Sequence, residues 1–432
     1  MSGGLAVAIR ELGCLPAVWR APHRSRADLE RRALEGVNDL LAYARGRVPH
    51  YRSPAYPDRP LAALADLAAL PLLTKRDVLD AGVAEFRAAG LSRRAYRVDV
   101  TSGTTGTRLE IWHDVGAYGY HGATVLRRFL TSGFRPWWRV AHIKPFPRPV
   151  RWFQRLGLFP RVVVPAGQSD EDIARQVLAA RPHLIMGYPL VLRGLLRTLT
   201  EADKRALGRT LRMVMTDSEL LTDEAAALLA SGFGVTVFDE YSAYEVLTVS
   251  SQCKAGSMHV DEDRVWLEIV DPDGRPVPDG VEGSVVVTHY RERAMPLVRY
   301  QLGDRAVGVP GGCACGSSFR RMKLVSGRVN DCVTLPDGRC VYSGVFLSLA
   351  MFTPGVAECM VRQDAAGRIT IYLVPDGTTD DAYARAVTAF RERFATLVDA
   401  PVDLSFRRSA RVELTPGGKG RFVESAYRPD GS

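Results

Sequence analysis

The sequence predicts a mixed α/β protein: a large N-terminal domain of βαβ-type sheets with an antiparallel subdomain, followed by a small C-terminal α+β domain. Up to about residue 260, apolar strand-like runs alternate with amphipathic helix patterns. Two strand patterns around a turn-rich stretch follow, and the last part combines short strands with one helix. We expect residues 1–327 to form the first domain and residues 328–432 the second.

The elements of the first part follow from periodicity and capping signals. Apolar residues at helical spacing between Leu29 and Ala44 predict an early amphipathic helix. Ser169 and Thr222 are residues typical of helix N-termini, each followed by acidic residues. Short apolar runs predict strands at 184–188, 211–216 and 235–241, and a further helix is expected after Pro189.

The later part of the sequence has short strand patterns separated by turns, which predicts antiparallel strands. RVWLEIV and GSVVVTHY flank the turn-rich DPDGRPVPDG, which predicts two antiparallel strands. Beyond SGRVND, VAECMVR and RITIYLV are joined by DAAG, and a helix over about 379–396 precedes another strand. These elements predict a separate compact α+β domain.

Composition narrows the class of protein. The 432 residues are 46% hydrophobic and 24% charged, which is typical of a folded globular chain. The net charge of +9 comes from scattered arginines without interleaved aromatics, so we expect no nucleic-acid partner. No segment is apolar enough to predict a membrane span, and seven cysteines, an odd number, favour the reducing cytoplasm.

One hydroxyl-rich stretch, V-T-S-G-T-T-G-T, predicts a phosphate-binding loop. Its glycines permit close backbone approach, and its hydroxyls and N–H groups suit an anion. A hydroxyl-rich turn beside a strand is the alternative, and the Walker A pattern is absent. The candidate phosphate ligands are Thr101, Ser102, Gly103, Thr104, Thr105, Gly106 and Thr107.

Further segments follow in a characteristic order. They are FDEYSAYE (238–245), VRYQLGD (298–304), SGRVND (326–331) and GGKG (417–420). Together with T-S-G-T-T-G, this series resembles the signatures of the adenylate-forming superfamily of acyl- and aryl-CoA ligases, adenylation domains and luciferases. TDSE (216–219), SMHVDED (257–263) and the compact length resemble the phenylacetate-CoA ligase branch.

The resemblance implies roles for individual residues in binding ATP and Mg²⁺. Glu245 would help bind Mg²⁺, Asp304 would accept hydrogen bonds from the ribose hydroxyls, and Lys419 would contact the carboxylate and the α-phosphate. Asp331 would be the hinge about which the C-terminal domain rotates. The other expected ATP or AMP contacts are Ser218, Glu219, Asp239, Glu240, Tyr241, Ser242 and Arg328.

The chain departs from the family pattern at two places. Ser242 and Tyr244 stand where the motif has glycine and threonine, and Arg108 follows the phosphate loop in place of the frequent Lys-Pro. These differences bear on the acid substrate more than on ATP. The acid pocket is expected near strand ends, with His142, Phe146, Tyr188 and Tyr244 as candidates that could equally be packed core residues.

Four further residues predict a metal site. Cys253, His259, Cys313 and Cys315 offer three thiolates and an imidazole, the ligand set of a closed structural zinc site. Four buried or reactive side chains without metal are the alternative. Some relatives in this branch carry a structural zinc in this region.

The resulting hypothesis is an ATP- and Mg²⁺-dependent ligase that adenylates a carboxylic acid, with an aromatic acid as the expected class, and passes the acyl group to coenzyme A. The open alternatives are transfer to an amine or another nucleophile, activation of an unusual small acid such as nitrite, and a non-catalytic nucleotide-binding relative. A homodimer is the default assembly.

Overall fold

The structure is a computed structural model that describes residues 13–100, 109–144, 154, 156–166, 168–326, 332–336, 339–376, 379–398, 402–414 and 420–427. The chain divides into two compact units, one of residues 1–136 and 238–324 and the other of residues 137–237 and 325–432. The expected division into domains at 327/328 stays a prediction, because residues 327–331 lie outside the described residues.

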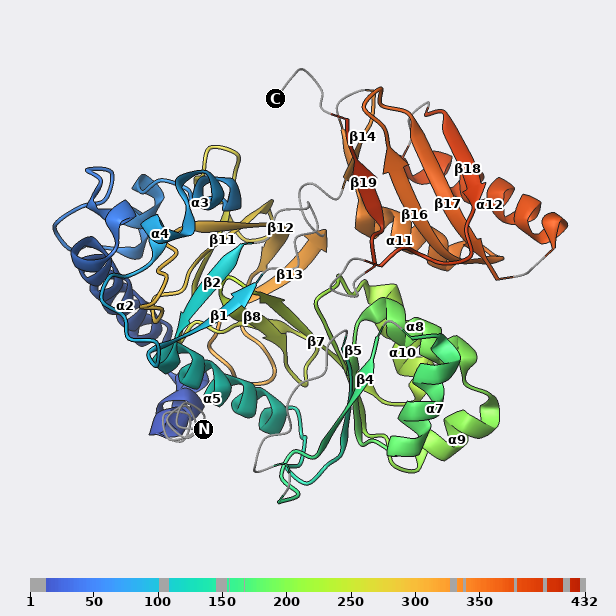
Figure 1. Ribbon diagram of the computed structural model, residues 1–432, viewed down its shortest axis with the longest axis horizontal. Helices are drawn as coiled ribbons and strands as arrows, with labels where there is room; N and C mark the ends of the chain where they lie inside the picture. The colour runs from blue at the N-terminus through green and yellow to red at the C-terminus, as the bar shows by residue number, and fades with distance from the viewer. Residues whose placement is uncertain are drawn as a thin grey trace. The chain divides into compact units, whose positions relative to one another are not determined.

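The first unit combines N-terminal helices with a largely antiparallel sheet (Figure 1). Its helical elements are η1 (Ala21–His23), α2 (Arg26–Arg47), η2 (Pro49–Arg52), η3 (Leu64–Ala69), α3 (Lys75–Ala81), α4 (Val83–Phe86) and α5 (Val115–Thr131). Its strands are β1 (Tyr96–Val100), β2 (Glu110–Asp114), β7 (Thr236–Ala243), β8 (Leu247–Gln252), β9 (Met258–Val260), β10 (Trp266–Val270), β11 (Glu282–Thr288), β12 (Tyr300–Val309) and β13 (Arg321–Ser326).

Pairing within this unit brings the motif-bearing strands together. The strand order is β10-β11-β12-β13-β9-β8-β7, and β1 and β2 form a separate antiparallel pair. The predicted antiparallel strands of RVWLEIV and GSVVVTHY are confirmed as β10 and β11. The antiparallel part begins earlier than expected, because β7 already pairs antiparallel with β8.

The second unit begins with a parallel sheet that has helices α7, α8, α9 and α10 packed beside it (Figure 1). The strands β6-β5-β3-β4 are neighbours in that order, and the pairs β6–β5, β5–β3 and β3–β4 are parallel. The elements are β3 (Val140–Lys144), β4 (Arg161–Pro165), α7 (Asp170–Ala180), β5 (Leu184–Gly187), α8 (Pro189–Thr198), α9 (Glu201–Gly208), β6 (Met213–Asp217) and α10 (Asp223–Phe233).

Side-chain caps explain where these helices begin. The Ser169 hydroxyl accepts a hydrogen bond from Asp172 N, and the Thr222 hydroxyl accepts one from Ala225 N, as the sequence predicts. Each cap satisfies an N–H that the helix leaves unpaired, a contribution of about 1 kcal/mol. The helix expected after Pro189 ends at Thr198, because Thr200 caps the separate helix α9.

The C-terminal part of the second unit is a mixed four-stranded sheet with two helices. The strand order is β18-β17-β16-β19, and a short antiparallel pair, β14–β15, lies outside that sheet. The elements are β14 (Cys332–Thr334), β15 (Cys340–Tyr342), α11 (Ser343–Phe352), β16 (Val356–Gln363), β17 (Ile369–Pro375), α12 (Asp380–Val398), β18 (Leu404–Arg408) and β19 (Val423–Ser425). Residues of both helices and of the sheet share one buried apolar cluster. The predicted α/β class, with its antiparallel part and its α+β C-terminal part, is confirmed.

No helix in the described ranges combines the length and apolar character needed to cross a bilayer.

Candidate active site

The predicted phosphate loop connects the strands of the β1–β2 hairpin. Val100 at the end of β1 pairs with Glu110 at the start of β2, so these two flanking residues lie side by side. The expected ligands from Thr101 to Thr107, and Arg108 after them, lie outside the described residues. The two strands that flank this stretch are described.

Asp304, the expected ribose ligand, is held by a residue of another motif. It lies on β12 directly after Gly303, whose positive φ of 83° favours glycine. The hydroxyl of Tyr241 on β7 donates a hydrogen bond of 2.6 Å to Asp304 Oδ2. Tyr241 itself is packed into a buried apolar cluster, so its ring fixes the direction of the hydroxyl. The FDEYSAYE and VRYQLGD segments therefore meet at a carboxylate.

Glu245, the expected Mg²⁺ ligand, is held in a similar way. It lies in the turn between β7 and β8, and Tyr300 Oη donates to Glu245 Oε1 over 3.3 Å. Tyr300 is buried and belongs to the same strand, β12, as Asp304. Two tyrosines thus orient the two carboxylates.

The remaining residues of the FDEYSAYE segment have different surroundings. Glu240 Oε2 lies 2.5 Å from a nitrogen of the buried Arg128, and Thr248 donates to Glu240 Oε1 over 2.7 Å. Asp239 N donates to Gln252 Oε1, and Ser242 lies at a register shift between β7 and β8. Tyr244 is 44% exposed, which leaves its ring accessible.

A second group of polar side chains gathers where the parallel strands β3, β5 and β6 end. Lys144 at the end of β3 donates to Asp217 Oδ1 at the end of β6 over 2.6 Å. The Lys144 ammonium also lies 4.7 Å from the ring centre of Tyr188, which follows β5. His142 Nε2 is 4.0 Å from Asp217 Oδ2. The carboxyl ends of parallel strands are the usual place for a ligand crevice.

Asp217 is ionised in this setting. Burial raises the pKa of its carboxyl, but the charges of Lys144 and His142 outweigh burial and lower the pKa to about 2. Of the predicted acid-pocket residues, His142 lies near Asp217 and Tyr188 lies near Lys144. Phe146 lies outside the described residues. The ion pair itself was missed from the sequence.

Ser218 and Glu219 follow Asp217 directly. Ser218 has a positive φ of 69°, an uncommon conformation for a residue with a side chain. Glu219 accepts hydrogen bonds from Leu190 N (3.2 Å) and from Gly420 N (2.7 Å). Gly420 follows Lys419 in the chain, and Lys419, Arg328 and Asp331 lie outside the described residues.

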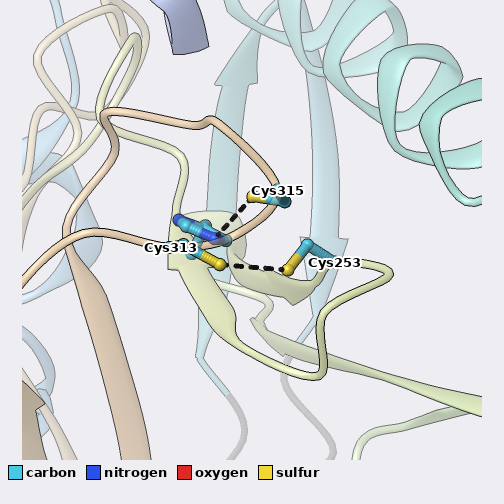
Figure 2. A group of neighbouring side chains, drawn as sticks. Cys253, Cys313 and Cys315 are labelled. Carbon is cyan, nitrogen blue, oxygen red and sulfur yellow. Dashed lines mark hydrogen bonds between the residues drawn. The ribbon is translucent and has the colours of Figure 1, made fainter.

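The four predicted zinc ligands lie together in the first unit. The ligand atoms of Cys253, His259, Cys313 and Cys315 are all within 4.8 Å of one another. The sulfurs of Cys253 and Cys313 are 3.7 Å apart, and Cys315 Sγ is 3.3 Å from His259 Nε2. Figure 2 shows Cys313 and Cys315, which lie on one loop, close to Cys253, which lies on another segment.

The surroundings of this cluster suit a metal. His259 Nδ1 lies 3.0 Å from the carbonyl of Phe319, so a proton on Nδ1 leaves Nε2 free to coordinate. Burial raises the pKa of Cys313, but hydrogen bonds from the Cys315 main chain, Ser257 and His259 outweigh it and lower the pKa to about 6. Burial and the neighbouring sulfurs raise the pKa of Cys315 to about 11. Three sulfurs and one nitrogen at these separations fit a tetrahedral zinc site.

Comparison with known proteins gives the family context. No family model matches the chain. Phenylacetate-coenzyme A ligase of Thermus thermophilus is 27% identical over 313 residues, covering 69% of this chain and 69% of that protein. The enzyme of the same name from Aromatoleum evansii is 28% identical over 336 residues, covering 71% and 72%.

Solved structures share the fold. A 2-hydroxyisobutyryl-CoA ligase in the postadenylation state, in complex with R3-HIB-AMP, has a TM-score of 0.78 at 17% identity, covering 94% of this chain and 92% of that one. An anthranilate CoA ligase in complex with anthranoyl-AMP has a TM-score of 0.57 at 19% identity, covering 77% and 67%.

The fold and these relatives support an ATP-dependent, AMP-forming acid ligase. Among the relatives compared, the chain is similar to phenylacetate-coenzyme A ligases at 27–28% identity over about 70% of its length.

Proposed function

We propose that this protein adenylates a carboxylic acid with ATP and then transfers the acyl group to coenzyme A. In the first half-reaction a carboxylate oxygen attacks the α-phosphorus, the bond to the β-phosphate breaks, and pyrophosphate leaves. In the second, the coenzyme A sulfur attacks the acyl carbon, AMP leaves, and the thiol proton passes to solvent. The observation that carries the proposal is the pair of carboxylates, Glu245 and Asp304, each held by a tyrosine hydroxyl from the other's motif.

The chain's residues would position ATP in three ways. The 101–107 loop would bind the β- and γ-phosphates at the end of the β1–β2 hairpin. Asp304, whose carboxylate Tyr241 orients, would accept from the ribose hydroxyls. Glu245 would hold Mg²⁺, an ion that prefers oxygen ligands and neutralises phosphate charge when bound.

Lys419 would act as the mobile cation of the first half-reaction. A lysine ammonium between the carboxylate and the α-phosphate stabilises the negative charge that develops there. The C-terminal domain would then rotate about Asp331, carry Lys419 away and open a path for the thiol. Arg328, close to the hinge, would contact ribose or phosphate.

An aromatic acid is the substrate class we propose. The support is the name of the relatives, phenylacetate-coenzyme A ligase, and the position of Tyr188 at the carboxyl edge of the parallel sheet. Lys144 lies in the same group, paired with the buried Asp217. Coenzyme A is favoured over an amine or another acceptor, because the relatives are CoA ligases.

We further propose that Cys253, His259, Cys313 and Cys315 hold a structural Zn²⁺. The four residues fill a tetrahedral coordination sphere and leave no position for substrate, so the ion would stabilise the fold without entering the reaction. A cytoplasmic location would keep these thiols reduced. Dimerisation remains an expectation.

A co-substrate screen tests the proposed function. Purified protein is incubated with Mg²⁺, ATP, coenzyme A and a panel of aryl, arylacetic and aliphatic acids, while AMP, pyrophosphate and product mass are read together. The proposal expects AMP and acyl-CoA in equal amounts with at least one aromatic acid. If product forms only with an amine, the acceptor is an amine and not coenzyme A. If no acid releases pyrophosphate with any acceptor, the proposed function is overturned.

A further inference from the structure

The turn that carries Glu245 has both of its flanking carbonyls bound by buried nitrogen side chains. His113 Nε2 lies 2.9 Å from the carbonyl oxygen of Tyr244, and Arg264 donates to the carbonyl of Val246 over 2.8 Å. Both His113 and Arg264 are fully buried. The main chain on either side of Glu245 is therefore fixed from within the first unit.

His113 is itself held by a buried carboxylate. Its Nδ1 lies 3.2 Å from Glu292 Oε2, and Glu292 is 2% exposed. The other oxygen, Glu292 Oε1, accepts hydrogen bonds from the main-chain nitrogens of Asp114, Arg293 and Ala294. With four hydrogen-bonding partners, this carboxylate has little freedom to move.

The hydrogen-bond partners of His113 determine which protonation state of its ring can donate to both of them. The Tyr244 carbonyl and the Glu292 carboxylate both present acceptor oxygens, so only an imidazolium, with a proton on each nitrogen, can donate to both. Asp99, whose carboxylate is 4.0 Å from Nε2, is a further charged group nearby, and the buried His121 and His289, whose pKa values burial lowers, are the other titratable neighbours. Burial lowers the pKa of His113, but Glu292, Asp99 and the Tyr244 carbonyl outweigh it and raise the pKa.

His113 also joins segments that are far apart in the sequence. It lies on β2, opposite Arg97 of β1, in the hairpin that leads into and out of the phosphate loop. Glu292 precedes the VRYQLGD segment, and Tyr244 precedes Glu245. His113 therefore links β2 of the phosphate-loop hairpin to two other segments. These are the turn that carries Glu245 and the chain that leads to Asp304.

We propose that His113, held by Glu292, is a positioning residue that sets the Glu245 turn relative to the phosphate-loop hairpin. The inference rests on the proposed role of Glu245 as the Mg²⁺ ligand. Loss of the Tyr244 contact should misplace Glu245, and so weaken binding of Mg²⁺–ATP and lower kcat, while the KM for the acid stays unchanged. A histidine that only fills space would affect folding stability without this selectivity.

Two substitutions of His113 separate these roles. In H113Q the amide nitrogen can reach the position of Nε2 and keep the donor to Tyr244, whereas in H113N it can only replace Nδ1. We expect H113N to lower kcat and the affinity for Mg²⁺–ATP by about ten-fold or more, the scale of one lost hydrogen bond to a charged donor, and H113Q to recover most of the loss. The matched control is H50Q, because His50 bonds Tyr56 elsewhere in the same unit.

Calorimetric titration of each variant with Mg²⁺–ATP, without acid, gives a measurement that does not depend on turnover. If the wild type turns over no acid, the proposed function falls, but the difference in affinity between H113N and H113Q still tests the positioning role. Equal affinities and equal kcat in H113N and H113Q, with both folded, would overturn it. If H113N does not fold, H113A with added imidazole replaces it; recovery of affinity is expected, and no recovery counts against the inference.

Discussion

The hydroxyl of Tyr241 donates a 2.6 Å hydrogen bond to Asp304 Oδ2, which joins two sequence motifs across the antiparallel sheet. The two residues lie on β7 and β12, and the Tyr241 ring is packed in a buried apolar cluster. If Asp304 accepts from the ribose hydroxyls as proposed, it benefits from being oriented before ATP arrives. The tyrosine is therefore expected to assist ATP binding through Asp304, without requiring its own contact with adenine.

Replacing Tyr241 with phenylalanine tests this role. Y241F removes the hydroxyl and keeps the packed ring, so Asp304 loses one orienting bond of about 1.5–3 kcal/mol. We expect the KM for ATP to rise about ten-fold or more, while the KM for the acid changes little. Steady-state kinetics with ATP varied at saturating acid provide the measurement.

The matched control for Y241F is Y56F, which removes the hydroxyl that contacts His50 in the N-terminal core. Y56F should leave the KM for ATP unchanged. An equal rise in both variants would show that the effect comes from general loosening of the first unit.

Lys419 should matter in only one half-reaction. K419A removes the cation expected between carboxylate and α-phosphate, so adenylation should be abolished. Thioester formation from a supplied acyl adenylate and coenzyme A should proceed at a similar rate to the wild type, because the proposed rotation would by then have carried Lys419 away. The two rates are measured separately, and equal loss in both would contradict the proposed domain rotation.

Breaking the Lys144–Asp217 pair should destabilise the second unit. K144M leaves the Asp217 carboxylate buried without its main partner, a change that typically costs about 3–5 kcal/mol. The double variant K144M/D217N removes the stranded charge and should recover much of the loss. Urea unfolding at pH 7 measures both, and a double variant no more stable than K144M would show that the pair is not the cause.

The same pair predicts a dependence on pH. The folded carboxyl has a pKa lowered to about 2 from an ordinary 3.8, so its stabilisation is complete above pH 3.8 and is lost as the pH falls toward 2. The stability difference between wild type and K144M/D217N should therefore shrink over that interval. A difference that stays constant from pH 7 to the lowest pH at which both proteins fold would contradict the assignment.

Zinc content tests the Cys/His cluster. Purified wild-type protein should carry about one zinc per chain by elemental analysis, and C253S should lose it and melt at a lower temperature. C14S is the control, because Cys14 lies outside the cluster. The proposed zinc site would be contradicted if wild-type protein purified without chelators contained no zinc and could not bind added zinc.

Local signals in the sequence predicted much of the fold. Ser169 and Thr222 mark helix starts because a hydroxyl before acidic residues caps the exposed N–H groups. The turn-rich DPDGRPVPDG predicts the β10–β11 pair for a similarly local reason. The zinc candidates were found because three cysteines and a histidine form a recognisable ligand set, although Cys253 and Cys313 are separated by 60 positions.

Contacts without a local signal could not be predicted. Lys144 and Asp217 are 73 positions apart, and His113 and Glu292 are 179 apart. Each of these four residues is an ordinary charged or polar residue in its own segment. It becomes part of a site only because the fold brings distant segments together. The chemistry of the motifs was therefore predictable, while the residues that orient them depend on the fold.

The most direct test of the central claim is to follow oxygen from the acid into AMP. An aromatic acid labelled with ¹⁸O in its carboxylate is converted to its coenzyme A thioester, and the released AMP is analysed by mass spectrometry. If the carboxylate attacks the α-phosphorus, the bridging oxygen leaves with AMP, which should carry one ¹⁸O per molecule. Product thioester formed with unlabelled AMP would contradict an acyl-adenylate intermediate.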